Sequence, residues 1–239
     1  MDYSAVLFDL DGTLLPMDEK EFVKGYFSLL AKKAVPYGYD PEQLTANVWK
    51  GTAVMVKNDG SRTNEEAFWD FFASVYGEEG LEDKAMFEDF YRNEFAGARR
   101  FTGFSPDAAY LVKALKERGV RVILATNPLF PKQATEMRIR WAGLEPENFE
   151  VYTTYEDWHY CKPNPLYYRE LADRLGLDPE TCLMVGNDAV EDMAAEKLGM
   201  KVFLLTDCLI AKEGVDYSRY PQGGFAELEG FLGIPAREG

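Results

Sequence analysis

Cysteine is scarce in this sequence, and the few cysteines that occur lie far apart. Cys161, Cys182 and Cys208 are odd in number and include no Cys-x-x-Cys pair. This pattern argues against a disulfide framework. We therefore expect reduced thiols in a cytoplasmic protein.

Long apolar runs and an excess of basic residues are also missing. No run approaches the roughly 18–20 apolar residues that a membrane-spanning helix needs, and Asp2 beside a short apolar run is unlike a secretory signal. The 26 basic residues against 41 acidic ones give a formal charge of −15. This charge argues against nucleic acid or an anionic membrane as a partner. An anionic substrate must therefore be bound by local positive charge.

The composition and the length are those of a globular protein. The 239 residues are 46% hydrophobic and 28% charged. This is enough for one large domain, or for a core domain with a smaller insertion. The sequence contains no internal repeat, low-complexity tract or long linker.

The first distinctive stretch is the segment 5–14, AVLFDLDGTL. Its apolar run predicts a buried strand, which ends in Asp9 and Asp11. In extended backbone, residues i and i+2 point to the same side, so we expect both carboxylates to face one site. Two such close negative charges are costly unless a cation or a shared proton relieves them. Gly12 permits the sharp turn that follows.

Residues 17–100 show helical periodicity and no convincing strand. One apolar stripe runs from Phe22 to Leu30, and a second helix is predicted to begin after Asp40-Pro41, where aspartate caps and proline opens a helix. A third follows Thr63, and a fourth carries the stripe Phe87–Phe95. We expect a helical bundle that is inserted as a separate small domain, with residues 1–16 and 101–239 forming the core.

From Thr102 onward, strands and helices alternate. The predicted helices are 105–119, 132–142, 165–175, 190–198 and 225–232, and the predicted strands are 120–125, 149–153, 182–185 and 201–205. Such alternation predicts an α/β fold with a parallel, doubly wound sheet. Ligands of these sheets bind beyond the carboxyl ends of the strands.

Four polar clusters fall at or near those carboxyl ends. They are Asp9/Asp11, Thr126/Asn127, Lys162 and Asp188/Asp192. Taken singly, each has an ordinary structural explanation: a turn, a strand-end cap, a solvated lysine or an acidic helix start. Their order along the chain and their common edge of the sheet favour a catalytic site.

The four clusters together resemble the motifs of the haloacid dehalogenase superfamily. The matching segments are Asp9-x-Asp11-Gly-Thr-Leu, Thr126-Asn127, Lys162-Pro and Gly-Asn-Asp188-x3-Asp192. The resemblance covers nearly the whole chain and implies a Rossmann-like core. The helical segment 17–100 resembles the α-helical, C1-type cap that one subclass inserts after the first motif.

The resemblance implies a role for each of the first three motifs. Asp9 is expected to attack phosphorus and become an aspartyl phosphate, while Asp11 protonates the leaving alcohol and then deprotonates the attacking water. Thr126 and Asn127 donate hydrogen bonds to the phosphoryl oxygens. Lys162 supplies a fixed positive charge to the same group and to Asp9.

The fourth motif implies a metal site. Asp188 is expected to bind Mg²⁺ together with a carboxylate oxygen of Asp9 and the backbone carbonyl of Asp11. By the same resemblance, Asp192 holds metal-bound water or orients Lys162.

Asp11 also separates the chemistries within the superfamily. Dehalogenases and phosphonate-cleaving relatives lack this second aspartate, so its presence indicates the phosphatase branch and a small phosphorylated metabolite as substrate. A sugar-phosphate phosphomutase and a non-catalytic binding protein on the same fold are the alternatives. A response-regulator receiver domain shares the aspartate, the metal and the lysine, but it is about half as long. We expect a monomer or a weak dimer.

Several other residues have weaker interpretations. His159, the only histidine, is expected to pack rather than to touch substrate. Lys50, Lys57, Asn58 and Arg62 surround a turn of the expected cap, where relatives carry specificity residues. The segments 15–17 and 99–102 are the expected hinges of cap closure.

Overall fold

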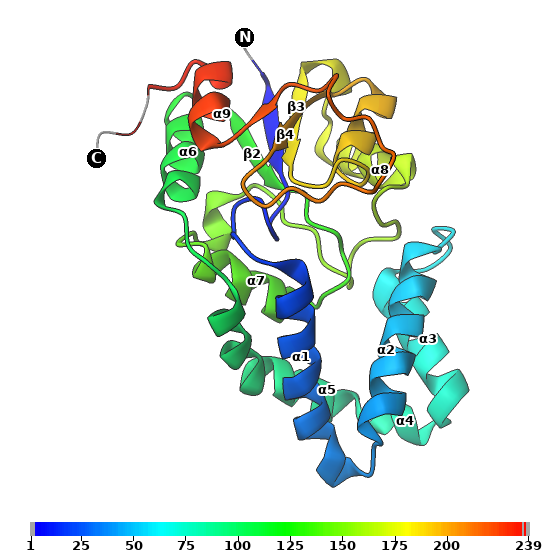
Figure 1. The fold of residues 1–239 in the computed structure, drawn as a ribbon. Helices are drawn as coiled ribbons and strands as arrows, with labels where there is room; N and C mark the ends of the chain where they lie inside the picture. Colours follow the sequence, from blue (N-terminus) through cyan, green and yellow to red (C-terminus); the bar gives the residue numbers. More distant parts are fainter. Residues whose placement is uncertain (1–2, 236, 238–239) are drawn as a thin grey trace.

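The computed structural model describes residues 3–235 and 237, and its centre is a five-stranded parallel sheet (Figure 1). The strand order is β2-β1-β3-β4-β5. Every pairing is parallel, and Phe8 at the end of β1 lies opposite Leu124 and Val185. The strands are β1 (Ala5–Phe8), β2 (Arg121–Leu124), β3 (Cys182–Gly186), β4 (Lys201–Leu205) and β5 (Gln222–Gly223).

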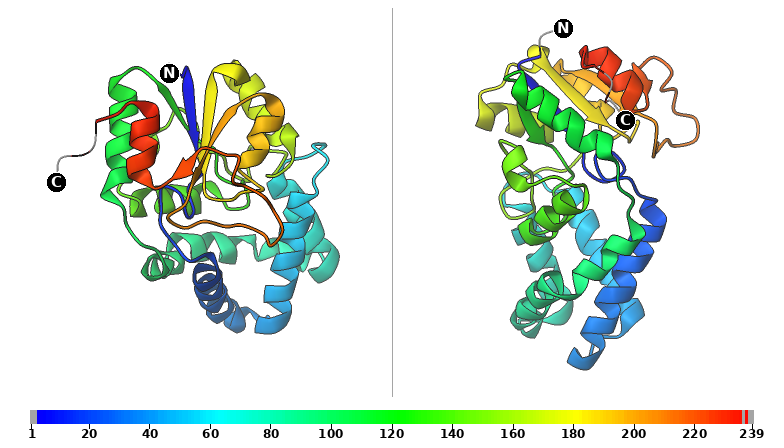
Figure 2. Two further views of the ribbon diagram at one scale, coloured as in Figure 1. Left: turned by 45° about the horizontal axis from the view of Figure 1, so that its top comes forward. Right: turned by 90° about the vertical axis from the view of Figure 1, so that its left-hand side faces the viewer.

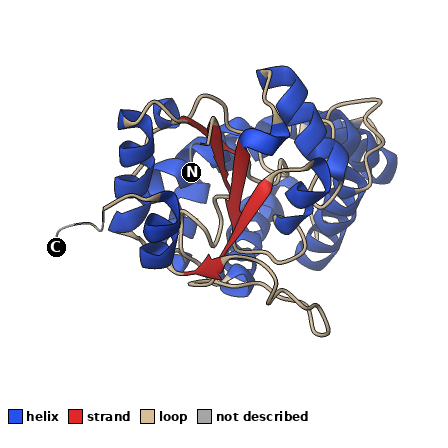
Figure 3. Cartoon of the chain, turned by 90° about the horizontal axis from the view of Figure 1, so that it is seen from above, coloured by secondary structure: helices blue, strands red, loops and turns tan. Residues whose placement is uncertain are grey.

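Helices cover both faces of this sheet, as the view from above shows (Figure 3). Alternate residues of β1 point to opposite faces: Val6 and Phe8 belong to one apolar core, and Ala5 and Leu7 belong to the other. The first core includes residues of α6 (Pro106–Glu117), α7 (Lys132–Trp141) and α9 (Phe225–Leu232), and the second includes α8 (Pro165–Leu175) and η5 (Met193–Leu198). The predicted doubly wound α/β fold is therefore confirmed.

Between β1 and α6, the described chain is helical and contains no strand. We call the segment Glu19–Phe101 the helical insertion; its elements are α1 (Glu19–Ala34), η1 (Val35–Tyr37), α2 (Pro41–Val56), α3 (Asn64–Tyr76), α4 (Glu79–Glu82), α5 (Lys84–Arg92) and η2 (Glu94–Phe101). The predicted helix starts are confirmed. Asp40 caps α2 by accepting from the Gln43 backbone N–H at 2.8 Å, and Thr63 forms a capping box with Glu66 at α3.

The helical insertion joins the core at two adjacent linkers (Figures 1 and 2). Met17 and Thr102 form an antiparallel bridge, and the Gly103 N–H donates to the Pro16 carbonyl at 2.6 Å. The insertion also contacts core loops through the start of α3. The backbone N–H groups of Asn64 and Glu65 donate to carbonyls of the loop between η3 (Pro146–Asn148) and α8, both at 2.8 Å.

Two predicted elements differ in the structure. The predicted strand 149–153 is present only as an isolated parallel bridge between Tyr152 and Leu124. The segment runs along the edge of β2 for a short distance, with backbone hydrogen bonds to Val122 and Leu124, before the Thr153 hydroxyl donates to the Thr126 carbonyl. The predicted helix 190–198 is the short 3-10 helix η5, since the Asp188 side chain accepts the backbone N–H groups of Val190 and Glu191 ahead of it. The elements α4, β5 and η4 (Pro179–Thr181) were not predicted from the sequence.

No helix in residues 3–235 or at 237 has both the length and the apolar content that crossing a membrane requires.

Candidate active site

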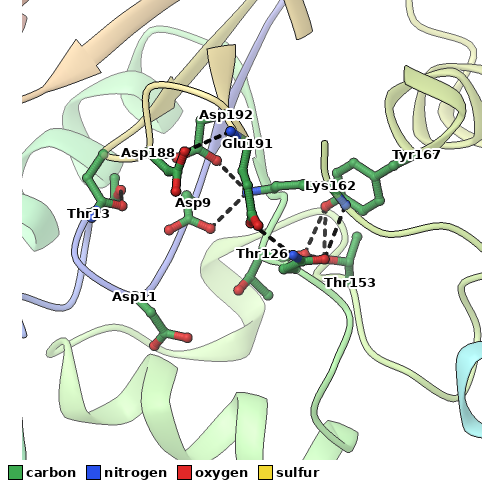
Figure 4. Close-up of polar contacts among 12 residues, drawn as sticks. Asp9, Asp11, Thr13, Thr126, Thr153, Lys162, Tyr167, Asp188, Glu191 and Asp192 are labelled. Atoms are coloured by element: carbon green, nitrogen blue, oxygen red, sulfur yellow. Dashed lines mark hydrogen bonds and ion pairs between the residues drawn. The ribbon is translucent and has the colours of Figure 1, made fainter. Parts of the chain in front are cut away.

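A buried lysine lies between two carboxylates at the carboxyl edge of the sheet (Figure 4). Lys162 donates its Nζ to Asp9 Oδ1 at 2.8 Å and to Asp192 Oδ1 at 2.6 Å. The side chains are 1%, 11% and 2% exposed, respectively. Burial alone lowers the pKa of Lys162, but the carboxylates of Asp192 and Asp9 outweigh burial and raise it well above its usual value. The ammonium therefore stays charged at neutral pH.

Asp9 and Asp192 are held in place by the strands beneath them. Asp9 follows β1 directly, and its backbone N–H donates to the Val185 carbonyl of β3 at 2.9 Å. Asp192 Oδ2 accepts from the Asp188 backbone N–H at 2.9 Å. Gly186 makes room for this carboxylate, because a Cβ at that position would lie 2.1 Å from Asp192 Oδ2. Burial raises the pKa of Asp192, and Lys162 opposes that rise.

The loop after β2 positions the backbone of Lys162. Asn127 Oδ1 accepts from the Lys162 backbone N–H at 3.2 Å, and Asn127 Nδ2 donates to Glu191 Oε2 at 3.0 Å. The Thr126 carbonyl accepts from the Tyr167 hydroxyl at 2.9 Å. The predicted pair Thr126/Asn127 is therefore brought to the same edge as Lys162, where the Thr126 carbonyl and the Asn127 side chain are fixed by several partners.

The acidic motif after β3 forms a turn that faces Asp9. Asp188 Oδ1 is occupied by the backbone N–H groups of Val190 and Glu191, at 2.7 and 2.8 Å. Sequence reasoning missed Glu191, whose burial raises its pKa to about 7. Its position between Asp188 and Asp192 in the same motif was the only available signal.

Asp9 and Asp11 point in different directions at the end of β1, although i, i+2 spacing predicted that they point to the same side. The strand ends at Phe8, so the chain is already turning at residues 9–11, and Thr13 and Leu15 donate backbone N–H groups to the Leu10 carbonyl. The Asp11 carboxylate points away from Asp9 (Figure 4). It forms an ion pair with Arg138 of α7. The alternation of side chains holds only where the backbone is extended.

The other oxygen of Asp11 is buried and has no hydrogen-bond partner in residues 3–235 and 237. Burial raises the pKa of Asp11 to about 6, although the Arg138 guanidinium pulls it in the opposite direction. A carboxyl group with this pKa carries a proton during part of the time near neutral pH, as a general acid and base requires.

Arg138 is a second residue that sequence reasoning missed. Its side chain is 1% exposed, and the guanidinium lies 4.3 Å from the ring centroid of Phe130 and 3.3 Å from the hydroxyl of Thr135. An arginine in a helix usually extends into solvent. The available signal was its spacing from Ala134 and Trp141, which places it on the buried face of α7.

The donor set fits a hard cation with few protein ligands. In the part of the chain that the structure describes, no group of three or more His, Cys, Asp and Glu side chains could hold a metal. Asp9 and Asp188 are two carboxylates at one sheet edge, and Mg²⁺ is commonly bound by one or two carboxylates while it keeps several waters. The acidic turn therefore fits Mg²⁺ better than a metal that needs a full protein cage.

The remaining candidate residues lie apart from this edge. His159 Nδ1 contacts Glu170 Oε1 at 2.7 Å and the Arg174 guanidinium at 3.2 Å, which agrees with a packing role. Arg62 of the turn between α2 and α3 pairs with Asp70. Asn58 closes that turn by donating to the Arg62 carbonyl at 2.9 Å.

Known proteins resemble this chain over most of its length. Residues 3–199 match the family described as haloacid dehalogenase-like hydrolase. The phosphoglycolate phosphatase of Rhodospirillum rubrum is 26% identical over 249 residues, which cover 97% of this chain and 91% of that protein. The pyrophosphatase PpaX of Bacillus cereus strain AH820 is 26% identical over 204 residues, covering 84% and 82%.

Solved structures show the same fold. A HAD phosphatase from Thermococcus onnurineus has a TM-score of 0.58 at 22% identity, with 96% of this chain and 98% of that chain covered. A HAD family hydrolase from Deinococcus radiodurans, solved with bound phosphate and sodium, has a TM-score of 0.54 at 21% identity, with 97% and 95% covered. The family match spans all four polar clusters, and the chain therefore belongs to the haloacid dehalogenase-like hydrolases.

Proposed function

We propose that the protein is a Mg²⁺-dependent phosphatase that hydrolyses a small phosphorylated metabolite through an aspartyl phosphate on Asp9. The observation that carries the proposal is the buried ammonium of Lys162, fixed between Asp9 and Asp192. It provides the local positive charge that a chain with a net charge of −15 needs in order to bind a phosphate. The phosphatase names of the relatives point in the same direction.

In the first proposed step, a carboxylate oxygen of Asp9 attacks phosphorus while the bond from phosphorus to the ester oxygen breaks. For this step the Asp11 side chain turns from Arg138 toward the bound ester and gives its proton to the leaving oxygen; its second oxygen has no other partner among the described residues. Lys162, Thr126 and Asn127 stabilise the negative charge on the phosphoryl oxygens.

In the second proposed step, Asp11 accepts a proton from water, and the water oxygen attacks phosphorus. The bond between Asp9 and phosphorus breaks, which releases inorganic phosphate and restores both carboxyl groups to their starting states. Asp9, Asp188 and the backbone carbonyl of Asp11 would hold Mg²⁺, which would supply further positive charge to the phosphoryl group. Asp192 acts by holding Lys162 in place.

The proposal is tested by the substitution Asp9→Asn with p-nitrophenyl phosphate and Mg²⁺. We expect a loss of at least a thousandfold in kcat, because an amide is not a nucleophile. Asp173→Asn, an identical change at an exposed position on α8, should leave activity unchanged. Brief incubation of the unchanged protein with labelled substrate should give a phosphoenzyme that hydroxylamine cleaves, as an acyl phosphate requires.

Two outcomes would overturn this mechanism. The first is wild-type turnover by the Asp9→Asn variant. The second is a labelled phosphoenzyme that resists hydroxylamine, since that would place the phosphoryl group on a residue other than an aspartate.

A further inference from the structure

A cavity of about 160 Å³ lies inside the helical insertion, next to the loop that follows β2. Its walls come from α1, α2, α3 and α5, and from Leu129, Phe130 and Tyr155 of the core. The lining is mostly aromatic and aliphatic, with Tyr26, Trp49, Met55 and Phe68 as examples. Figure 1 shows α1 and α2 running from the level of the active-site loops to the far end of the insertion.

The cavity reaches the catalytic residues on the side of Asp11. Phe130 lines the cavity and also lies against the Arg138 guanidinium, which pairs with Asp11. Asp11 is the residue that protonates the leaving oxygen in the proposed mechanism. The cavity is therefore next to the leaving group of a bound ester, and not next to the phosphoryl group at Lys162.

A second residue supports this placement. Glu19 lines the cavity and begins α1, which follows the linker from β1 and the Asp9–Asp11 segment. The cavity therefore extends toward the end of α1 that is nearest to the first motif in the chain.

The lining offers no cation to a second anionic group. It contains no lysine, arginine or histidine, and its only charged residue is the carboxylate of Glu19. Three of its hydroxyl groups are engaged: those of Tyr26 and Tyr91 bond to each other at 2.8 Å, and that of Thr52 donates to the Val48 carbonyl at 3.0 Å. The Trp69 Nε1–H is a buried donor with no hydrogen-bond partner among the described residues. A carboxylate or a second phosphate placed there would lose its hydration without gaining a cation.

We infer that the protein acts on phosphate monoesters whose leaving group is neutral and apolar, with about the bulk of one six-membered ring. This inference rests on the proposed phosphatase activity. The size follows from the volume, because an apolar cavity of about 150 Å³ in another protein binds benzene. The aromatic walls favour a flat ring or a short alkyl chain, which burial removes from water.

A neutral leaving group would distinguish the substrates of this chain from those for which two relatives are named. Phosphoglycolate carries a carboxylate, and pyrophosphate carries a second phosphoryl group. Two relatives at 26% identity are named for these compounds. Neither compound finds a counter-charge in the cavity of this chain, so we expect both to be poor substrates.

The experiment measures kcat/KM for a series of primary alkyl phosphates, from ethyl to hexyl, together with benzyl phosphate, phosphoglycolate and pyrophosphate. Primary alkoxides leave with similar ease, so differences among the alkyl esters report binding of the chain. We expect kcat/KM to rise by about fourfold for each added methylene until the cavity is full. Benzyl phosphate should exceed phosphoglycolate and pyrophosphate by at least tenfold.

Two variants at one position of α2 link this preference to the cavity. Thr52→Phe fills the space and should abolish the rise with chain length. Thr45→Phe is the matched control, because Thr45 makes the same hydroxyl bond to a carbonyl of its own helix but does not line the cavity. Thr52→Lys places an ammonium in the lining and should raise the rate with phosphoglycolate relative to that with hexyl phosphate.

The outcomes distinguish this inference from the proposed function. Turnover of p-nitrophenyl phosphate with equal or lower rates for longer alkyl chains would overturn the apolar leaving group and leave the phosphatase proposal standing. A rise with chain length that persists in Thr52→Phe would overturn the placement in this cavity. Absence of turnover with every ester would overturn the proposed function itself.

Discussion

Replacing Lys162 with methionine should destabilise the protein strongly, because it removes the one cation between two buried carboxylates. Lys162 contacts Asp9 and Asp192, and all three residues are at least nine-tenths buried. Methionine keeps much of the length and bulk of the lysine side chain. The substitution therefore removes the charge and leaves the packing largely intact.

The expected magnitude follows from the burial of the partners. Removing one member of a buried ion pair typically costs about 3–5 kcal/mol, because the remaining charge is left without compensation. For a chain of this length, each kcal/mol lowers the melting temperature by about 2–4 °C, so we expect a decrease of about 6–20 °C. The loss of stability caused by Lys162→Met should be smaller at lower pH, because protonated carboxyl groups carry no charge that a cation must neutralise.

The sign of that pH dependence is fixed by the direction of the pKa shift. Burial raises the pKa of Asp192 above its value in the unfolded chain. The folded protein then binds more protons than the unfolded chain at mildly acidic pH, so its stability falls as the pH rises. In Lys162→Met no ammonium opposes the effect of burial on Asp192, so the free energy of unfolding should fall more steeply with rising pH than in the unchanged protein.

The assay is urea unfolding of metal-free protein at pH 7.5 and 5.5, followed by circular dichroism. Lys113→Met is the matched control, since Lys113 is 76% exposed and lies 3.8 Å from Glu117, and its loss should cost less than about 1 kcal/mol. Adding Asp192→Asn to Lys162→Met should restore part of the stability, because it removes one uncompensated charge. The reasoning is refuted if Lys162→Met is as stable as the control.

The other predictions concern Arg138 and the glycine beneath Asp192. Arg138→Met removes the cation that lowers the pKa of Asp11. For an alkyl phosphate, the pH at which kcat/KM declines on the alkaline side should therefore rise by about one to three units. An unchanged pH profile would contradict the assigned role of Asp11. Gly186→Ala should displace Asp192, reduce activity at least tenfold and cost about 1–3 kcal/mol of unfolding free energy. Gly230→Ala in α9, where a Cβ meets open space, should instead stabilise by about 0.5–1 kcal/mol, and equal effects of the two changes would count against the steric argument.

Local sequence signals were sufficient for many of the helices and strands. The helices Pro165–Leu175 and Phe225–Leu232 have the predicted bounds. Each ends at a glycine in the left-handed region, at positions 176 and 233, and the first also opens on a proline. These signals act within a few residues and depend little on the rest of the fold.

Features that depend on contacts across the fold could not be predicted in the same way. The separation of Asp9 from Asp11 results from a turn that begins one residue after β1, together with an arginine 127 residues further along the chain. The burial of Arg138 and the partial burial of Glu191 arise only when α7, the loop after β1 and the acidic turn pack together. Motif spacing identified which residues meet at the sheet edge, but it carried no information about where each carboxylate points.

The contact at the start of α3 couples the helical insertion to two loops of the candidate active site. Asn64 is fully buried, and its side-chain amide donates to the Pro128 carbonyl at 3.2 Å and to Cys161 Sγ at 3.3 Å. Pro128 follows Asn127, and Cys161 precedes Lys162, so one side chain of the insertion fastens both loops that we propose bind the phosphate. We propose that the insertion lifts when product leaves; this motion would break these bonds and loosen both loops in the same event. Hydrogen exchange of the Asn64 backbone amide, which donates to the Trp158 carbonyl, would then report how often the insertion opens.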